Sequence, residues 1–325
     1  MRYIPRPGRR ALLGAALGTP LLPSPARPAP SWSPDGPVRI LVGAAPGGVT
    51  DILARIVAEA GSAALGQPVV VENPSGASGN IAAAAAARAR PDGRTLLLGF
   101  GALVANRLRD DPPGALDPLR DLLPVARVGT SPATIMVHAR SGIADFPALA
   151  AALRARRGEA TWAPPIPGTL LHLVGQALLT RLGVNAEMIP YRGSGAVVPD
   201  FLAGRLDFVC DTPSAYLSYL KDGTLRAVAV AAARRSPLLP DVPALADFGV
   251  EGIDGTSWWG LLAPAAIPRP AAEAVAAIVR DAVTRPATRT RMAALCLDPA
   301  PAGPEEFAAL ISGELTRWRP VAAAL

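Results

Sequence analysis

The sequence predicts an α/β protein built from two units of similar plan. Strand-like and helix-like segments alternate along the chain, and this alternation restarts near residue 125. The 325 residues, half of them hydrophobic, suffice for two domains of ordinary size with buried cores.

The first unit has a β-α-β-α-β order. In sequence order, its segments are a β-rich run at 38–42, a Gly/Pro turn at 44–50, a helix from Asp51, a strand at 69–72, a Gly-rich loop at 73–80, an Ala-rich helix, a turn at 91–93 and a strand at 95–99. This order predicts a mostly parallel sheet covered by helices.

The second unit begins with a long β-type stretch at 125–138. Further strands are predicted at 161–163, 187–190, 206–210, 225–231 and 256–262, and helices at 146–156, 170–182, 196–203, 270–285 and 304–318. Two long strands that pass between the units indicate a bilobal protein. Pockets favour domain interfaces and the carboxyl ends of parallel strands, so we expect one cleft lined by loops 44–51, 99–106, 164–172 and 211–214.

The positive charge is concentrated at the amino terminus. The formal net charge is +6, but five arginines precede the first acidic residue, Asp35, and the rest of the chain is nearly neutral. That distribution argues against nucleic acid as a partner. The basic start, the apolar run 11–22 and the small residues and prolines of 23–30 predict a cleaved export signal over 1–30, hence an exported protein. Arg9-Arg10 also fits a twin-arginine signal. Because the cleavage region contains no cysteine, a lipoprotein is not expected.

The scarcity of cysteine and histidine excludes several site types. Two cysteines and two histidines cannot form a disulfide scaffold, an iron–sulfur cluster or a His-rich metal site, and we expect Cys210 and Cys296 to be buried thiols. Gly99-Phe100-Gly101 lacks the third glycine of a dinucleotide fingerprint, and no helix is expected to open there, so no nicotinamide cofactor is predicted.

An exported α/β hydrolase is the enzyme alternative. The sequence has no Gly-x-Ser-x-Gly elbow, and only His138 and His172 could act as a histidine base. His138 ends an apolar strand, where a structural role is expected. His172 lies near a helix start beside the expected cleft, where it either contacts ligand or only caps and packs, and we favour contact.

The turn at 45–51 joins a strand to a helix. Its glycines let the backbone approach a ligand, Thr50 or Asp51 can cap the helix, and free N–H groups at a helix start favour an anion. A plain strand–helix turn with a cap explains the motif equally well.

Several motifs occur together in a characteristic order. They are Pro46-Gly47-Gly48-Val49-Thr50-Asp51 running on to Arg55, Gly66-Gln67-Pro68 before the strand ending at Asn73, Gly79-Asn80-Ile81, Pro91-Asp92-Gly93, Pro190-Tyr191-Arg192-Gly193-Ser194, and the segment from Arg234 to Pro243. From about Pro37 to Trp318 the chain resembles the Bug family, the extracytoplasmic solute receptors of tripartite tricarboxylate transporters.

The resemblance implies a periplasmic binding protein fold of type II, with two α/β lobes, a hinge of crossing strands and a ligand cleft. Lobe 1 would comprise residues 37–130 and 256–325, and lobe 2 residues 131–255. It further implies a monomer that needs no cofactor, catalyses no reaction, captures a small organic carboxylate and delivers it to integral-membrane permease subunits. The implied ligand contacts are Gly47, Gly48, Val49, Thr50, Asp51, Gly101, Ala102, Gly168, Thr169, His172, Tyr191, Gly193 and Asp211.

This chain departs from the family pattern where polar or flexible residues are usual. The apolar or stiff residues at these places are Ala45, Val49, Phe100, Ala102, Leu103, Pro164-Pro165-Ile166-Pro167 and Leu171. Burying a charged group without polar partners is costly, so we expect a monocarboxylate with an apolar or aromatic body rather than citrate. Trp258 and Trp259, on the last predicted strand, either report closure or simply pack. A diverged receptor that has lost binding and a ligand-sensing subunit of a membrane signalling protein remain alternatives.

Overall fold

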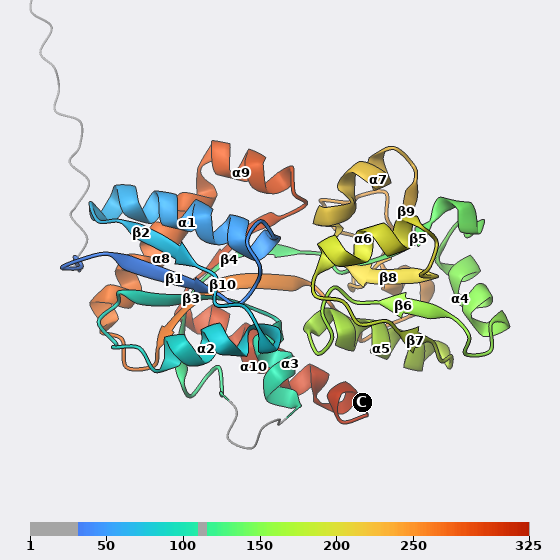
Figure 1. Ribbon diagram of the computed structural model, residues 1–325, viewed down its shortest axis with the longest axis horizontal. Coiled ribbons are helices and arrows are strands. Elements are labelled where there is room, and N and C mark those ends of the chain that lie inside the picture. Colours follow the sequence, from blue (N-terminus) through green and yellow to red (C-terminus); the bar gives the residue numbers. More distant parts are fainter. Residues whose placement is uncertain (1–31, 110–115, 325) are drawn as a thin grey trace, which may run out of the picture. The chain divides into compact units, whose positions relative to one another are not determined.

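The computed structural model describes residues 32–109 and 116–324 (Figure 1). The chain divides into two units, Met1–Pro30 and Ser31–Leu325. The predicted export signal lies outside the described residues. Within the described ranges, none of the helices combines the length and apolar character needed to cross a membrane.

Two separate sheets form the larger unit, each with its own helices (Figure 1). The first has the strand order β11-β4-β10-β3-β1-β2 and the second β7-β6-β8-β5-β9. The strands are β1 (Val38–Val42), β2 (Val69–Glu72), β3 (Thr95–Phe100), β4 (Leu122–Ser131), β5 (Thr134–His138), β6 (Thr161–Ala163), β7 (Glu187–Met188), β8 (Phe208–Asp211), β9 (Leu225–Val230), β10 (Ser257–Pro264) and β11 (Asp298–Ala302).

Helices cover both faces of the first sheet and flank the second. They are α1 (Val49–Leu65), α2 (Asn80–Ala87), α3 (Ala102–Leu108), α4 (Phe146–Ala155), α5 (Leu170–Leu182), α6 (Ser194–Leu202), α7 (Leu217–Lys221), α8 (Arg269–Thr284), α9 (Pro286–Ala293) and α10 (Pro304–Ala322). Short 3₁₀ turns occur at Ala77–Gly79, Ala139–Ser141, Pro213–Tyr216 and Leu245–Phe248.

Both sheets are mixed. In the first, β1 pairs in parallel with β2 and β3, whereas β10 is antiparallel to β3 and β4, and β11 to β4. In the second, β6 is parallel to β7 and β8, and β5 is antiparallel to β8 and β9. The α/β class and the two lobes predicted from the sequence are confirmed.

The expected single β stretch at 125–138 is wrong in detail. It is two strands, β4 in the first sheet and β5 in the second, separated by Pro132 and Ala133. Proline has no N–H to donate, which favours an interruption at this point. Where the chain crosses between the sheets, Ala231 N–H donates to the Ala133 carbonyl and Gly255 N–H to the Ala231 carbonyl, both at 2.8 Å. Three crossing segments are thus tied together.

Four helices and strands were not predicted from the sequence periodicity. The helix α3 opens after Gly101, where none was expected, and α7 lies between the strands predicted at 206–210 and 225–231. Helix α9 and strand β11 lie between the helices predicted at 270–285 and 304–318, a stretch for which no element was predicted. Strand β11 contains two prolines, and only Asp298, Pro299 and Ala302 of it register with β4. Proline is tolerated at a sheet edge, because no ladder donor is needed on the open side.

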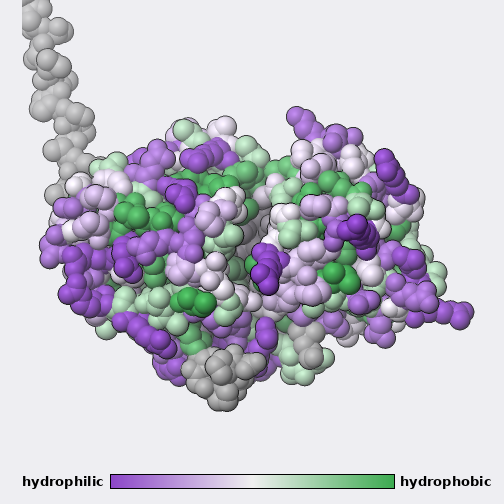
Figure 2. Space-filling model, in the orientation of Figure 1, coloured by the Kyte–Doolittle hydropathy of each residue, from purple (hydrophilic) through white to green (hydrophobic). Residues whose placement is uncertain are grey.

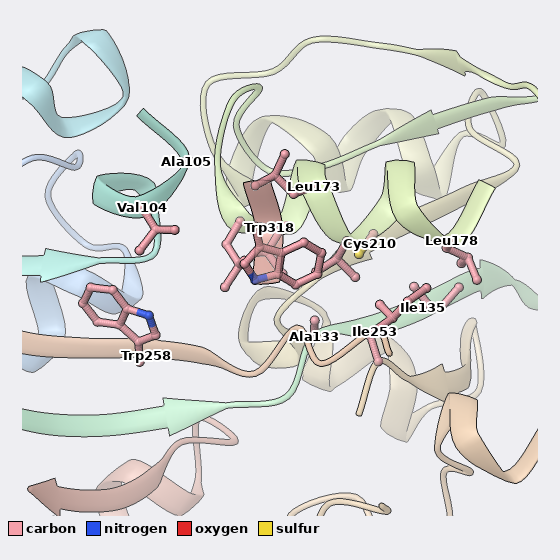
Figure 3. Packing of buried hydrophobic residues seen from close by; sticks show 14 of the residues in the cluster. Val104, Ala105, Ala133, Ile135, Leu173, Leu178, Cys210, Ile253, Trp258 and Trp318 are labelled. Carbon is pink, nitrogen blue, oxygen red and sulfur yellow. The ribbon is translucent and has the colours of Figure 1, made fainter. Parts of the chain in front are cut away.

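An apolar cluster extends across both lobes behind the cavity described below. It includes Val104 of α3, Leu173 of α5 and Trp318 of α10, which Figure 3 shows with their neighbours. A second cluster packs α1 and α8 against the other face of the first sheet, and a small third one lies under α6. Helix α10 contacts both α3 of the first lobe and α5 of the second, so it packs against both lobes in this cluster.

Candidate functional site

A cavity of about 610 Å³ lies between the two lobes, and Figure 2 shows the surface hollowed there. It is walled by the loop before α1, the end of β3, the starts of α3, α5 and α6, the loop after β8, and the first residues of β10. The carboxyl ends of β1, β3 and β8 all face it, which is where parallel strands place ligand sites.

The loop before α1 offers backbone N–H groups to the cavity. Helix α1 starts after Gly48, which supplies no side-chain cap, and Gly47 has a φ of 83°. The first-turn N–H groups of Val49 and Thr50 have no acceptor within the helix, and a helix start favours an anion. Gly47, Gly48, Val49 and Thr50 line the cavity, as expected from the sequence.

Asp51 holds this loop from behind and does not line the cavity. Its Oδ2 accepts the Gly47 N–H at 2.9 Å and Arg55 Nε at 2.9 Å, and its Oδ1 accepts Asn73 Nδ2 at 3.1 Å. Burial alone would raise its pKa, but these hydrogen bonds and the charge of Arg55 lower it. The expectation that Thr50 or Asp51 caps α1 is wrong, because the Asp51 carboxylate turns back to Gly47, two residues before the helix.

The two adjacent tryptophans of β10 line the cavity with their indole N–H groups already bonded within the protein. Trp259 Nε1 donates to Thr50 Oγ1 at 3.0 Å, and Trp258 Nε1 donates to Glu314 Oε2 at 2.7 Å. Both residues line the cavity and are almost fully buried. Since each indole N–H already has an acceptor in the protein, the rings are left to pack against apolar atoms.

The wall from the second lobe carries hydroxyl groups around one buried carboxyl group. Asp211, at the end of β8, is 1% exposed and accepts the Thr212 N–H at 2.6 Å and the Tyr216 hydroxyl at 3.0 Å. The Ser194 hydroxyl donates to it as well. Burial raises the pKa of Asp211 to about 6 against the opposing effect of these hydrogen bonds. Asp211, Thr212 and Ser194 all line the cavity.

Of the thirteen residues predicted to contact ligand, nine line the cavity. Besides the four of the first loop, these are Gly101, Ala102, Thr169, Gly193 and Asp211. Asp51, Gly168, His172 and Tyr191 are not among the lining residues.

The interactions of these other residues explain their positions. His172 Nδ1 accepts the Gly168 N–H at 3.1 Å, and its ring packs on Trp162. Burial, and secondly the charge of Arg109, lowers the pKa of His172, which suits a neutral packed imidazole. The Tyr191 hydroxyl donates to Asp200 Oδ2 at 2.7 Å.

Sequence reasoning missed a basic residue at the cavity. Arg192 lines it, next to the predicted Gly193, and its side chain is exposed. It is the only lysine or arginine among the described lining residues. Arg192 was part of the Pro190–Ser194 motif in the sequence, but the resemblance implied contacts only at its neighbours Tyr191 and Gly193.

Hydrolase and metal chemistry find no support in the described part of the chain. Ser194, Ser214 and Ser257 line the cavity, whereas neither histidine does. Over the same residues, no cluster of three His, Cys, Asp or Glu side chains could hold a metal ion. Both cysteines are free and buried, and burial raises the pKa of each thiol, as the sequence led us to expect.

Most departures from the family pattern lie on the cavity wall. The lining residues among them are Ala45, Val49, Phe100, Ala102, Pro165, Ile166 and Leu171, whereas Leu103, Pro164 and Pro167 do not line it. Leu171 is 8% exposed at the start of α5, directly after Leu170, which packs toward Gly101 of the first lobe. The cavity is therefore largely apolar on both sides.

Comparison with known proteins identifies relatives over nearly the whole chain. The description "Tripartite tricarboxylate transporter family receptor" (TctC) matches residues 53–325. Protein BugT of Bordetella pertussis is 33% identical over 289 residues, 89% of each chain. MatC of Rhodopseudomonas palustris, solved with bound malate, is 29% identical with a TM-score of 0.80, over 89% of this chain and 99% of MatC. Rpa4515 of the same organism, solved with adipate, is 30% identical with a TM-score of 0.82, over 89% of this chain and 97% of the other. The chain belongs to the tripartite tricarboxylate transporter receptor family, whose members are solute-binding proteins and not enzymes.

Proposed function

We propose that this protein is a periplasmic receptor that captures a small monocarboxylate with an apolar or aromatic body and delivers it to integral-membrane permease subunits. Export would use the amino-terminal signal. Relatives bound to malate and adipate support the carboxylate class, and the family supports the transport role. No resident cofactor is needed for this function.

The observation that carries the proposal is the apolar replacement on the cavity wall. Phe100, Ile166 and Leu171 line the cavity at positions where the family usually has hydroxyl-bearing or small residues. A second ligand carboxylate placed against them would lose its hydration without gaining donors. An aromatic or aliphatic body would instead bury apolar area against these side chains and the faces of Trp258 and Trp259.

The carboxylate itself has two candidate partners. The free N–H groups at the start of α1 suit it, because hydrogen bonds to a charged acceptor contribute about 1.5–3 kcal/mol each. Arg192 faces the same cavity from the second lobe. Contacts from both lobes to one anion would favour the closed arrangement, since a ligand shifts an equilibrium only by its differential affinity for the two states.

Binding to the mature protein, purified free of ligand, tests the proposal. The panel is 3-phenylpropionate, its neutral analogue 3-phenylpropan-1-ol, malate, adipate and citrate. We expect 3-phenylpropionate to raise the unfolding free energy by about 2.7 kcal/mol at 100 times its dissociation constant, and the alcohol to do nothing. Preference for malate, adipate or citrate would contradict the apolar assignment. No stabilisation by any member would favour a diverged receptor.

A variant at Leu171 tests which wall recognises the body. Leu171→Ser should weaken the affinity for 3-phenylpropionate about tenfold, because the apolar body would cover the serine hydroxyl without offering it a partner, which costs roughly 1–3 kcal/mol. Leu171→Met, similar in volume, should retain most of the affinity. Equal affinity in the serine variant would place the apolar body elsewhere.

The neighbouring genes distinguish transport from sensing. Genes for membrane subunits beside this one would favour transport, and a sensor-kinase gene would favour the sensing alternative.

A further inference from the structure

Asp211 is a buried carboxyl group that faces the ligand cavity without a cation. Its four hydrogen-bond donors are all neutral: the Thr212 N–H and hydroxyl, the Tyr216 hydroxyl and the Ser194 hydroxyl. Among the described ion pairs, none includes Asp211. A buried carboxylate without a cation has lost its hydration, so the charged form is disfavoured relative to the neutral acid.

The size of the cavity keeps any bound anion close to this group. A sphere of 610 Å³ is about 10 Å across, and like charges at that separation still repel appreciably where the effective dielectric constant is about 20. A ligand carboxylate therefore raises the affinity of Asp211 for a proton wherever it sits in the cavity.

We propose that Asp211 takes up a proton when a carboxylate enters the cavity, so that the site accommodates a single negative charge. This inference rests on the proposed function. The proton comes from solvent and binds to a carboxyl oxygen of Asp211. No other bond forms or breaks. The ligand carboxylate stays ionised, and the proton on Asp211 removes the repulsion between the two groups.

The hydroxyl groups around Asp211 permit this change. When Asp211 becomes an O–H donor, the Ser194 and Tyr216 hydroxyls can rotate and accept, since each oxygen both donates and accepts. Ser194 lines the cavity, so its freed O–H can then turn toward the ligand.

Glu314, behind Trp258, has a pKa that burial raises to about 7, so it also changes charge between pH 6 and pH 8. The titratable groups around Asp211 itself keep one charge state over this range. Burial keeps the neighbouring Cys210 thiol and the Tyr216 hydroxyl neutral by raising their pKa values far above this range. Tyr191, which interacts with Tyr216, is neutral over this range, because burial and the Asp200 carboxylate raise its pKa to about 12. Asp200 itself, bonded to Tyr191 and Arg205, has a lowered pKa and stays ionised. In the first lobe, Asp51 has a lowered pKa. Arg192, which lines the cavity from the same lobe as Asp211, has an exposed side chain.

Calorimetry of the mature protein with 3-phenylpropionate tests the proposal, because the ligand stays ionised from pH 6 to pH 8. We expect about fivefold tighter binding at pH 6 than at pH 8, and uptake of about half a proton per ligand near pH 7. Heats measured in phosphate and in Tris, whose ionisation enthalpies differ, give the proton count. Binding without proton uptake overturns this inference and leaves the proposed function standing. Absence of binding to every carboxylate tested overturns both.

Asp211→Asn should abolish the pH dependence and the proton uptake while retaining binding at pH 8. Asp207→Asn is the matched control: Asp207 lies next to the other end of β8, outside the lining, and pairs with Arg156. It should behave as the wild type. Glu314 is the other buried acid near the cavity, behind Trp258. If the pH dependence disappears in Glu314→Gln and persists in Asp211→Asn, the assignment to Asp211 is wrong. The wild-type proton count decides the question even if one variant fails to fold.

Discussion

Asp51 in the first lobe and Asp211 in the second are the two most buried carboxyl groups beside the cavity, at 2% and 1% exposure. Asp51 lies in the first turn of α1 and Asp211 at the end of β8, and each accepts a backbone N–H together with side-chain donors. Their pKa values nevertheless move in opposite directions, lowered for Asp51 and raised to about 6 for Asp211.

The difference between them is a cation. Arg55 binds both oxygens of Asp51 across one helical turn, at 2.9 and 3.1 Å, and Asp211 has only neutral donors. Burial alone therefore does not determine what a carboxylate does here. With Arg55, Asp51 serves as a fixed anchor for the first loop, and without a cation Asp211 is left able to respond to charge in the cavity.

The largest effect is expected from removing the anchor. Asp51→Ala leaves the Gly47 N–H without its acceptor and the Asn73 amide with only the Ala44 carbonyl, and we expect it to lower the unfolding free energy by about 2–4 kcal/mol. Urea unfolding at pH 7 measures this. Asp92→Ala, which removes a partly exposed carboxylate paired with Arg94, should cost about 1 kcal/mol or less. Equal costs for the two variants would mean that Asp51 is not an anchor.

The pH dependence of stability should separate the two aspartates next. The raised pKa of Asp211 means that its contribution to stability is fully present below about pH 4 and is lost as the pH rises through about 6. The loss amounts to about 2–3 kcal/mol at pH 7. Asp51 behaves oppositely: its contribution is present above about pH 4 and is lost as the pH falls through its lowered pKa.

Asp211→Asn isolates the first of these contributions. Stability of the wild type minus that of the variant should increase from pH 7 to pH 5, as measured by urea unfolding without ligand. A difference that stays constant over this range would show that Asp211 does not titrate there.

The sequence predicted the frame of this site better than its side-chain roles. The strand ends and the two glycines before α1 placed Gly47 to Thr50 and Asp211 at one cleft, because alternating β and α segments dictate which loops meet. That Asp51 turns away depends on Asn73, 22 residues distant, and on Arg55 one turn along the helix. The i, i+4 spacing shows that a contact between Asp51 and Arg55 is possible, but no sequence pattern indicates the contact with Asn73.

The same limit applies to His172 and Trp258. Proximity of His172 to the cleft was readable from the sequence, but its bond to Gly168 and its packing on Trp162 belong to tertiary structure. Trp258 lines the cavity with an indole N–H held by Glu314, 56 residues away on α10. No local pattern identifies such a partner, so whether a polar group is free for ligand can be decided only once the fold is known.

The smallest effect, and the sharpest test of the comparison, is expected at Arg55. Its side chain is 53% exposed, so Arg55→Gln should lower the unfolding free energy far less than Asp51→Ala does. The pKa of Asp51 should nevertheless rise, because the variant removes the charge of Arg55, while the bonds from Gly47 and Asn73 remain. The stability difference should shrink between 0.05 and 0.5 M salt, measured by urea unfolding, since exposed charges are screened. A loss of stability as large as that in Asp51→Ala would mean that the ion pair with Arg55 supplies most of the stability that Asp51 contributes. A small cost with a raised Asp51 pKa would show that the cation sets the direction of the pKa change, whereas the buried hydrogen bonds supply most of the stability.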